Sequence, residues 1–268
     1  MSAAVSPPVR LGRLLLAEAL GTALLLAIVV GSGVMAERLF PGQNGLALLA
    51  NALATGAGLY ALMVSLGPVS GAHLNPVVSL WAAMRGQLSW RHASGYALAQ
   101  GVGAVAGVLA AHAMFDLPLL QHATQPRTGM TQWFSEAVAT FGLLWMILST
   151  QQHSPQRTPA AVALYIVSAY WFTASTSFAN PAVTLARSLT DSFAGIALGD
   201  VGGFVLAQVV GGLWAVPDFG PDRPAGASDF NDLCRVRGAG AVRAGIENAA
   251  PVAAAEKPCR EWPAPGPI

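Results

Sequence analysis

Two asparagines followed by proline are the residues best placed to act on a solute: Asn75 before Pro76, and Asn180 before Pro181. Asparagine is a preferred N-cap residue, and proline is favoured at the first position of a helix. Each pair therefore predicts a helix start, and the asparagine amides can orient the hydroxyl group of a solute. The positive end of the helix dipole would also repel cations. The pattern predicts contact with uncharged, hydrogen-bonding solutes.

Two acids lie in otherwise apolar stretches, Glu18 and Glu136. An acid at membrane depth is energetically costly and is a functional candidate by default. His73, two residues before Asn75, is interpreted either as a pore-lining residue or as a structural histidine. The sequence shows no nucleophile–base pair, phosphate-binding loop or metal-binding cluster, so we expect no enzyme activity, no cofactor and no metal site.

The composition indicates a lipid environment, because 54% of the 268 residues are hydrophobic and only 10% are charged. Soluble proteins carry about 25% charged residues. Residues 1–216 contain eight arginines, no lysine and six acids, whereas the last 52 residues contain 13 charged residues and eight of the 18 prolines. We expect a membrane domain over residues 1–216 and a disordered tail over residues 217–268. A net charge of +1 argues against a nucleic-acid partner.

The apolar segments predict six membrane spans, since a helix needs about 20 residues to cross ~30 Å of hydrocarbon. The expected spans are 11–35, 45–66, 92–114, 130–150, 159–176 and 200–216. Two pieces, 76–85 and 181–190, are about half that length, and each begins at Asn-Pro. A helix can end at membrane depth only where protein or a water-filled cavity surrounds its polar backbone groups. These pieces are therefore expected to be re-entrant half-helices.

The polar residues repeat in the same order in both halves of the membrane domain. Glu18, Asn75 and Gln100 in the first half correspond to Glu136, Asn180 and Gln208 in the second. Three spans per half is an odd number, so the second half is inverted, with a binding path at the midplane between the halves. Gln100 and Gln208 are expected to make interhelical hydrogen bonds. Five arginines against three favour a cytoplasmic N-terminus.

The segment 70–78 (SGAHLNPVV) resembles the first signature loop of the aquaporin, or major intrinsic protein, family, and 178–183 (FANPAV) resembles the second. The resemblance covers nearly all of residues 11–216. It implies an all-α membrane protein with six spans and two half-helices in an inverted 3+3 repeat, assembled as a homotetramer of independent pores in the lipid bilayer. The implied pore motifs are Asn75, Pro76, Val77, Asn180, Pro181 and Ala182, with Val77 in place of the usual alanine. Glu18 and Glu136 would brace the loops before each Asn-Pro.

The resemblance also implies an outer constriction at fixed offsets from the two asparagines. Counting along the sequence gives Thr55, Ser168, Ser177 and Val183. Many family members place an arginine where this chain has Val183, so the small side chains predict a wide, uncharged opening. Arg187 lies one helical turn, ~5.4 Å, beyond Val183. It is interpreted either as a cationic group at the outer mouth or as an arginine that snorkels to the membrane interface.

The stretch 179–195 resembles bacterial aquaporins linked to arsenic resistance. This implies passive conduction of small neutral solutes across a bacterial inner membrane, including arsenite as As(OH)₃, related polyols and water. Three alternatives remain open: a water channel with an atypical filter, a non-conducting membrane scaffold, and an ion-coupled transporter. The last would need titratable groups along the path, for which Glu18, Glu136 and His73 are the candidates.

Overall fold

The apolar segments fold into helices in the computed structural model, which describes residues 10–215. The long helices are α1 (Leu11–Leu39), α2 (Asn44–Ser70), α4 (Trp90–Met114), α5 (Met130–His153), α6 (Thr158–Phe172) and α8 (Leu198–Trp214). The short ones are α3 (Pro76–Met84), α7 (Pro181–Ala186) and two 3₁₀ turns, η1 (Pro155–Arg157) and η2 (Arg187–Leu189). The expected tail, 217–268, lies outside the described residues.

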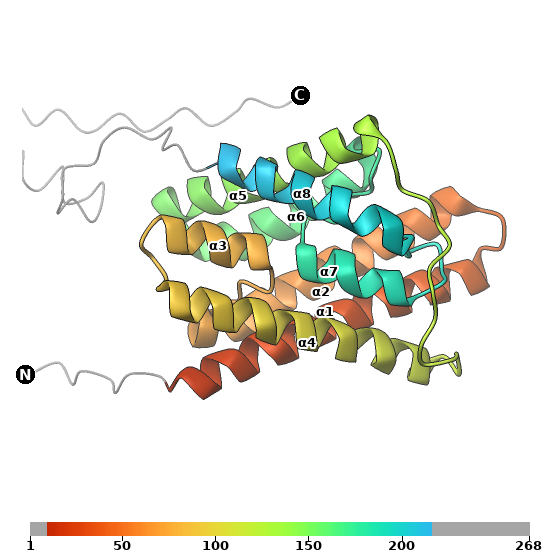
Figure 1. Ribbon diagram of the computed structural model, residues 1–268, viewed down its shortest axis with the longest axis horizontal. Helices are drawn as coiled ribbons and strands as arrows, with labels where there is room; N and C mark the ends of the chain where they lie inside the picture. Colours follow the sequence, from red (N-terminus) through yellow and green to blue (C-terminus); the bar gives the residue numbers. More distant parts are fainter. Residues whose placement is uncertain (1–9, 216–268) are drawn as a thin grey trace, which may run out of the picture. The chain divides into compact units, whose positions relative to one another are not determined.

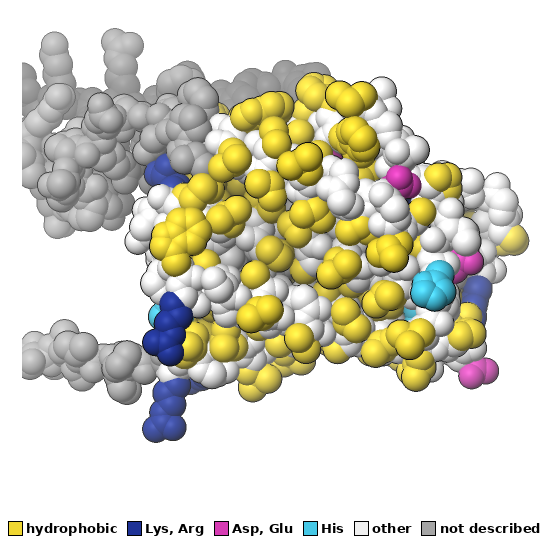
Figure 2. Space-filling model, in the orientation of Figure 1, with side chains coloured by type: hydrophobic (Ala, Val, Ile, Leu, Met, Phe, Trp, Pro, Cys, Tyr) yellow, Lys and Arg dark blue, Asp and Glu magenta, His cyan; other side chains and the backbone are white. Residues whose placement is uncertain are grey.

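Helices α1, α2, α4 and α5 are each long and apolar enough to cross a membrane, with 24 to 29 residues. Helices α6 and α8 are shorter, with 15 and 17 residues. Figure 2 shows apolar side chains spread along the flank of the bundle and charged side chains gathered toward its two ends. Leu16, Leu98 and Leu206 are all more than 60% exposed. Such a distribution suits a protein whose flank faces lipid.

Each half of the bundle is held by a close approach of two helices. Helix α1 packs along α4, and α5 packs along α8. A methyl group added at Gly103 would overlap the backbone carbonyl of Ala19, and one added at Gly211 would overlap that of Ala137. Glycine is required at both positions because the backbones come into direct contact. Equivalent contacts in the two halves are what the repeat in the sequence predicts.

The half-helices α3 and α7 start where the Asn-Pro pairs predict. The Asn75 side chain accepts a hydrogen bond from Val77 N at 3.0 Å, and that of Asn180 accepts from Ala182 N at 3.0 Å and from Val183 N. Proline occupies the first turn of both helices. Figure 1 shows α3 and α7 one after the other along the bundle, among the long helices.

Candidate functional site

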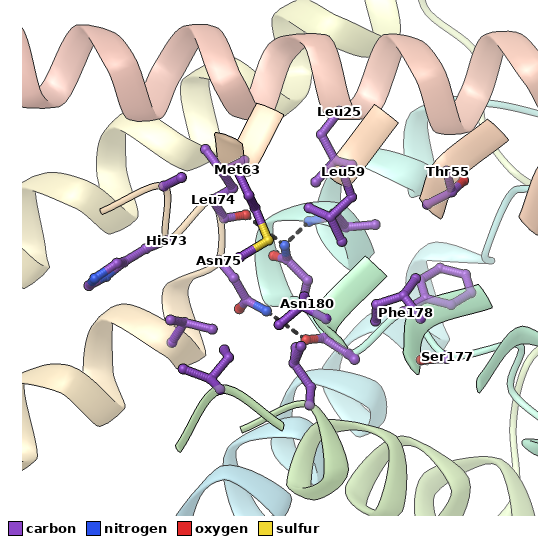
Figure 3. A pocket seen from close by; sticks show the side chains of 18 of the residues that line it. Leu25, Thr55, Leu59, Met63, His73, Leu74, Asn75, Ser177, Phe178 and Asn180 are labelled. Atoms are coloured by element: carbon purple, nitrogen blue, oxygen red, sulfur yellow. Dashed lines mark hydrogen bonds between the residues drawn. The ribbon is translucent and has the colours of Figure 1, made fainter. Parts of the chain in front are cut away.

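The two helix starts meet in the middle of the bundle and are cross-linked by their capping asparagines. The Asn75 amide donates to the Ala179 carbonyl at 2.8 Å, and the Asn180 amide donates to the Leu74 carbonyl at 2.8 Å. Both dashed contacts are visible in Figure 3, where the two side chains point toward one another. Each asparagine therefore caps its own helix through its side-chain oxygen and donates a hydrogen bond to the opposite half through its side-chain nitrogen.

The segments before each Asn-Pro have an unusual backbone. Ala72, Leu74, Ser177 and Ala179 all have positive φ angles, between +46° and +50°. Left-handed backbone costs residues other than glycine roughly 1–2 kcal/mol each. The strained positions lie one and three residues before each asparagine, so they follow the repeat. Strain of this kind persists only where surrounding contacts fix it.

Glu18 supplies those contacts in the first half. Its carboxylate is fully buried and accepts hydrogen bonds from the backbone N–H groups of His73 at 3.0 Å and Leu74 at 2.7 Å. It also accepts from the Ser70 hydroxyl at 2.6 Å and from the Gln100 amide at 2.7 Å. Hydrogen bonds to an ionised acceptor contribute about 1.5–3 kcal/mol each, which is enough to offset the backbone strain.

Glu136 makes the equivalent contacts in the second half. It is fully buried and accepts from Phe178 N and Ala179 N, both at 2.9 Å, and from the Gln208 amide at 2.6 Å. Neither Glu136 nor Glu18 lines the cavity described below. Their geometry is that of braces turned away from the passage.

An elongated cavity with a volume of about 120 Å³ runs past the paired asparagines. One end, here called the Arg187 end, is lined by Thr55, Tyr170, Ser177, Phe178, Val183 and Arg187. The opposite end, here called the Gln151 end, is lined by His73, Trp81, Gln87, Gln151 and Thr158. In Figure 3 Thr55, Phe178 and Ser177 lie to one side of the asparagines and His73 lies to the other.

Arg187 is buried at its end of the cavity, with only 2% of the residue exposed. Its guanidinium carbon lies 3.5 Å from the centroid of the Phe178 ring, and its Nε donates to the Ala194 carbonyl. An arginine that snorkels to the interface would be exposed, so the structure contradicts that interpretation. The expectation of an uncharged opening is also wrong, because Arg187 supplies a cation one turn after Val183.

Ser168 does not line the cavity, contrary to the sequence prediction. It is exposed, and its hydroxyl donates to the Leu164 carbonyl of its own helix at 3.0 Å. Tyr170, two residues on and ~200° around α6, faces the cavity instead. Its hydroxyl lies 3.2 Å from the Thr55 hydroxyl. Counting from Asn180 failed because the face of α6 that lines the cavity is set by how the helix packs against α2 and α5.

Comparison with known proteins agrees with this geometry. The family model described as "Major intrinsic protein" matches residues 7–215.

This chain belongs to the major intrinsic protein family.

Aquaglyceroporin AqpS from Rhizobium meliloti is 54% identical over 206 residues, covering 77% of this chain and 88% of the relative. Aquaporin Z from Rhodopseudomonas palustris is 30% identical, covering 74% and 88%. The solved structure of the aquaglyceroporin from Plasmodium falciparum shares the fold, with a TM-score of 0.60 at 21% identity, covering 77% of this chain and 93% of that one. As a member of this family, the chain is a multi-pass membrane channel for small solutes and not an enzyme.

The remaining candidate residues also line this aquaporin-type cavity. Thr55, Ser177 and Val183 line it as predicted from their offsets. The Ser177 hydroxyl is buried and has no hydrogen-bond partner among residues 10–215. His73 both lines the cavity and is fixed in place, because its Nδ1 lies 3.0 Å from the Ser79 hydroxyl and its ring packs edge-on against Tyr96.

Neither Tyr170 nor Arg127, a buried residue behind the Arg187 end, was identified from the sequence. A tyrosine in an apolar helix is a usable signal, since its hydroxyl normally finds a partner when buried. Arg127 lies in the connection between the two halves, where an isolated arginine is unremarkable.

Proposed function

We propose that this channel passively conducts small uncharged polyhydroxy solutes, including arsenous acid, As(OH)₃, together with water. We further propose that it works as a homotetramer with a cytoplasmic N-terminus, which would make the Arg187 end the outer mouth. The observation that carries the proposal is the mixed lining of that end, where hydrogen-bonding groups face the apolar ring of Phe178.

The Arg187 end combines three kinds of contact. The guanidinium of Arg187 donates hydrogen bonds, and the Ser177 hydroxyl can donate or accept. The Thr55 and Tyr170 hydroxyls form a hydrogen bond with each other. That bond uses one of their two protons, so the other proton can be donated to a solute. The Phe178 ring, on which the Arg187 guanidinium stacks, adds an apolar wall to the same end. A triol with hydroxyls on one side and an apolar edge on the other matches this lining.

Charge along the cavity supports uncharged cargo. Two helix starts bring their positive ends together at the asparagines, and Arg187 adds a cation at one mouth. The two acids that could attract a cation are turned away into hydrogen bonds with the backbone. Among the titratable groups of the described chain, those lining the cavity are His73, Tyr170 and Arg187. Arsenous acid is mostly neutral at physiological pH, so this field does not oppose its entry.

The relatives support a pore wider than one for water alone. The protein 54% identical to this chain is described as an aquaglyceroporin, and the region after Asn180 resembles arsenic-linked bacterial aquaporins. Val183 leaves room where an arginine would project directly from the first turn of α7.

The test is uptake of As(III), glycerol and water by proteoliposomes that contain the full chain. Val183→Arg should lower As(III) and glycerol entry about tenfold or more, because a second guanidinium would crowd the Arg187 end. Ser168→Ala is the matched control and should leave uptake unchanged, since Ser168 is exposed.

Each alternative has its own outcome. Unchanged As(III) entry in Val183→Arg would show that the constriction is assigned to the wrong residues. Swelling with water but not glycerol would identify a water channel, and no flux from folded protein would identify a scaffold. Flux that depends on membrane potential would point to ion-coupled transport.

A further inference from the structure

Arg127 lies in the segment between α4 and α5, which links the two halves of the channel. The residue is only 8% exposed, although this connection has no regular secondary structure around it. Its backbone N–H donates to the Asp200 carboxylate at 2.7 Å, at the start of α8. The main chain is therefore anchored while the side chain turns inward.

The guanidinium of Arg127 joins two segments that flank Arg187 in sequence. It donates to the Ser175 carbonyl at 3.2 Å and the Thr176 hydroxyl at 3.4 Å, just before α7. It also donates to the Phe193 carbonyl at 3.1 Å and the Gly195 carbonyl at 2.8 Å, after η2. Four bonds from one side chain fix the loop before the half-helix relative to the loop after it.

The same two segments hold Arg187. Ala194, which accepts from Arg187 Nε, lies between the two residues whose carbonyls bind Arg127. Phe178 contacts both guanidinium groups, with the Arg127 carbon 4.9 Å and the Arg187 carbon 3.5 Å from the ring centroid. The carbonyl and the ring that orient Arg187 are thus both positioned by Arg127.

Repulsion between the guanidinium groups of Arg127 and Arg187 affects where the Arg187 side chain points. Two buried guanidinium groups on one ring repel each other, and the effect is strong where little water screens it. Arg127 is held by its four acceptors and does not line the cavity, whereas Arg187 does. Repulsion from a fixed cation therefore favours conformers in which Arg187 extends toward the cavity.

We infer that Arg127 is a positioning residue that holds Arg187 across the mouth and so sets the size limit for solutes. This inference rests on the proposed function, because a size limit has meaning only for a conducting pore. It makes the link between the two halves part of the selectivity apparatus.

The test compares Arg127→Gln and Arg127→Lys, each alone and in an Arg187→Ala background. The readout is the ratio of erythritol to glycerol permeability in proteoliposomes, normalised to folded channel. A positioning role predicts that Arg127→Gln raises this ratio about threefold or more, as contacting residues commonly couple on that scale. Arg127→Lys keeps the cation and should lie between Arg127→Gln and the wild type.

The double variants separate positioning from general stability. If Arg127 acts through Arg187, Arg127→Gln should change the ratio no further once Arg187 is alanine. An unchanged ratio in the wild-type background, or an equal rise in both backgrounds, would overturn the inference. If Arg127→Gln does not fold, the lysine variant in both backgrounds decides the question in the same way. If the wild-type channel passes only water, the proposed function is refuted but the role of Arg127 is not. The ratio of glycerol to water permeability in the Arg127 variants would then test that role.

Discussion

Replacing Glu136 by glutamine should weaken the channel through the backbone that the carboxylate supports. Glutamine has one oxygen where glutamate has two, so it can accept from Phe178 N or from Ala179 N but not from both at their present positions. The other N–H then faces an amide NH₂ group and loses its acceptor. Losing one hydrogen bond to a charged group costs about 1.5–3 kcal/mol.

This loss can be converted into a measurable shift. For a chain of this size, 1 kcal/mol corresponds to roughly 2–4 °C in Tm, so the Tm of the variant in detergent should fall by about 3–12 °C. The left-handed residues Ser177 and Ala179 would also be free to relax, and each releases about 1 kcal/mol or more. A relaxed loop favoured by about 1.4 kcal/mol would leave roughly one channel in ten with the native passage. Water permeability per folded channel should therefore fall about tenfold.

The assay needs thermal unfolding and stopped-flow permeability on the same purified protein. Asp116→Asn is the matched control, because it makes the same acid-to-amide change at an exposed site outside the cavity. Both its Tm and its permeability should equal those of the wild type. If Glu136→Gln also matches the wild type in both measurements, the bracing argument is refuted.

Three further predictions concern packing, the mouth and pH. Gly211→Ala should lower the stability by about 1–3 kcal/mol by thermal unfolding, whereas Gly202→Ala in the same helix, with open space around it, should not. Tyr170→Phe should reduce glycerol permeability more than water permeability, since one hydroxyl leaves the mouth; equal effects would contradict this. Hydrogen bonds from Thr124 lower the pKa of Asp191 below 3.8. Hydrogen exchange should therefore show the Thr124 amide protected at neutral pH and released only as the pH falls below that value; release at pH 5 would argue against the contact.

Much of the architecture can be predicted from local patterns in the sequence. A cap such as Asn75 or Asn180 acts on N–H groups within three residues, so the start of a half-helix can be predicted from the dipeptide alone. Span length follows from the thickness of the bilayer, and the repeated Glu, Asn and Gln residues reveal two equivalent halves.

The mouth of the pore could not be predicted in the same way. Tyr170 bonds Thr55 across 115 positions of sequence, and Arg127 reaches residues 48 to 68 positions away. Which face of α6 lines the cavity depends on how the helix is rotated against its neighbours, and offset counting therefore chose Ser168. Sequence alone determined two capped half-helices within six apolar spans, because caps and bilayer crossing are short-range constraints. Tertiary structure alone decided that Arg187 is buried beside the passage, because the segments around it are brought together by contacts between distant residues, such as that of Arg127 with Phe178.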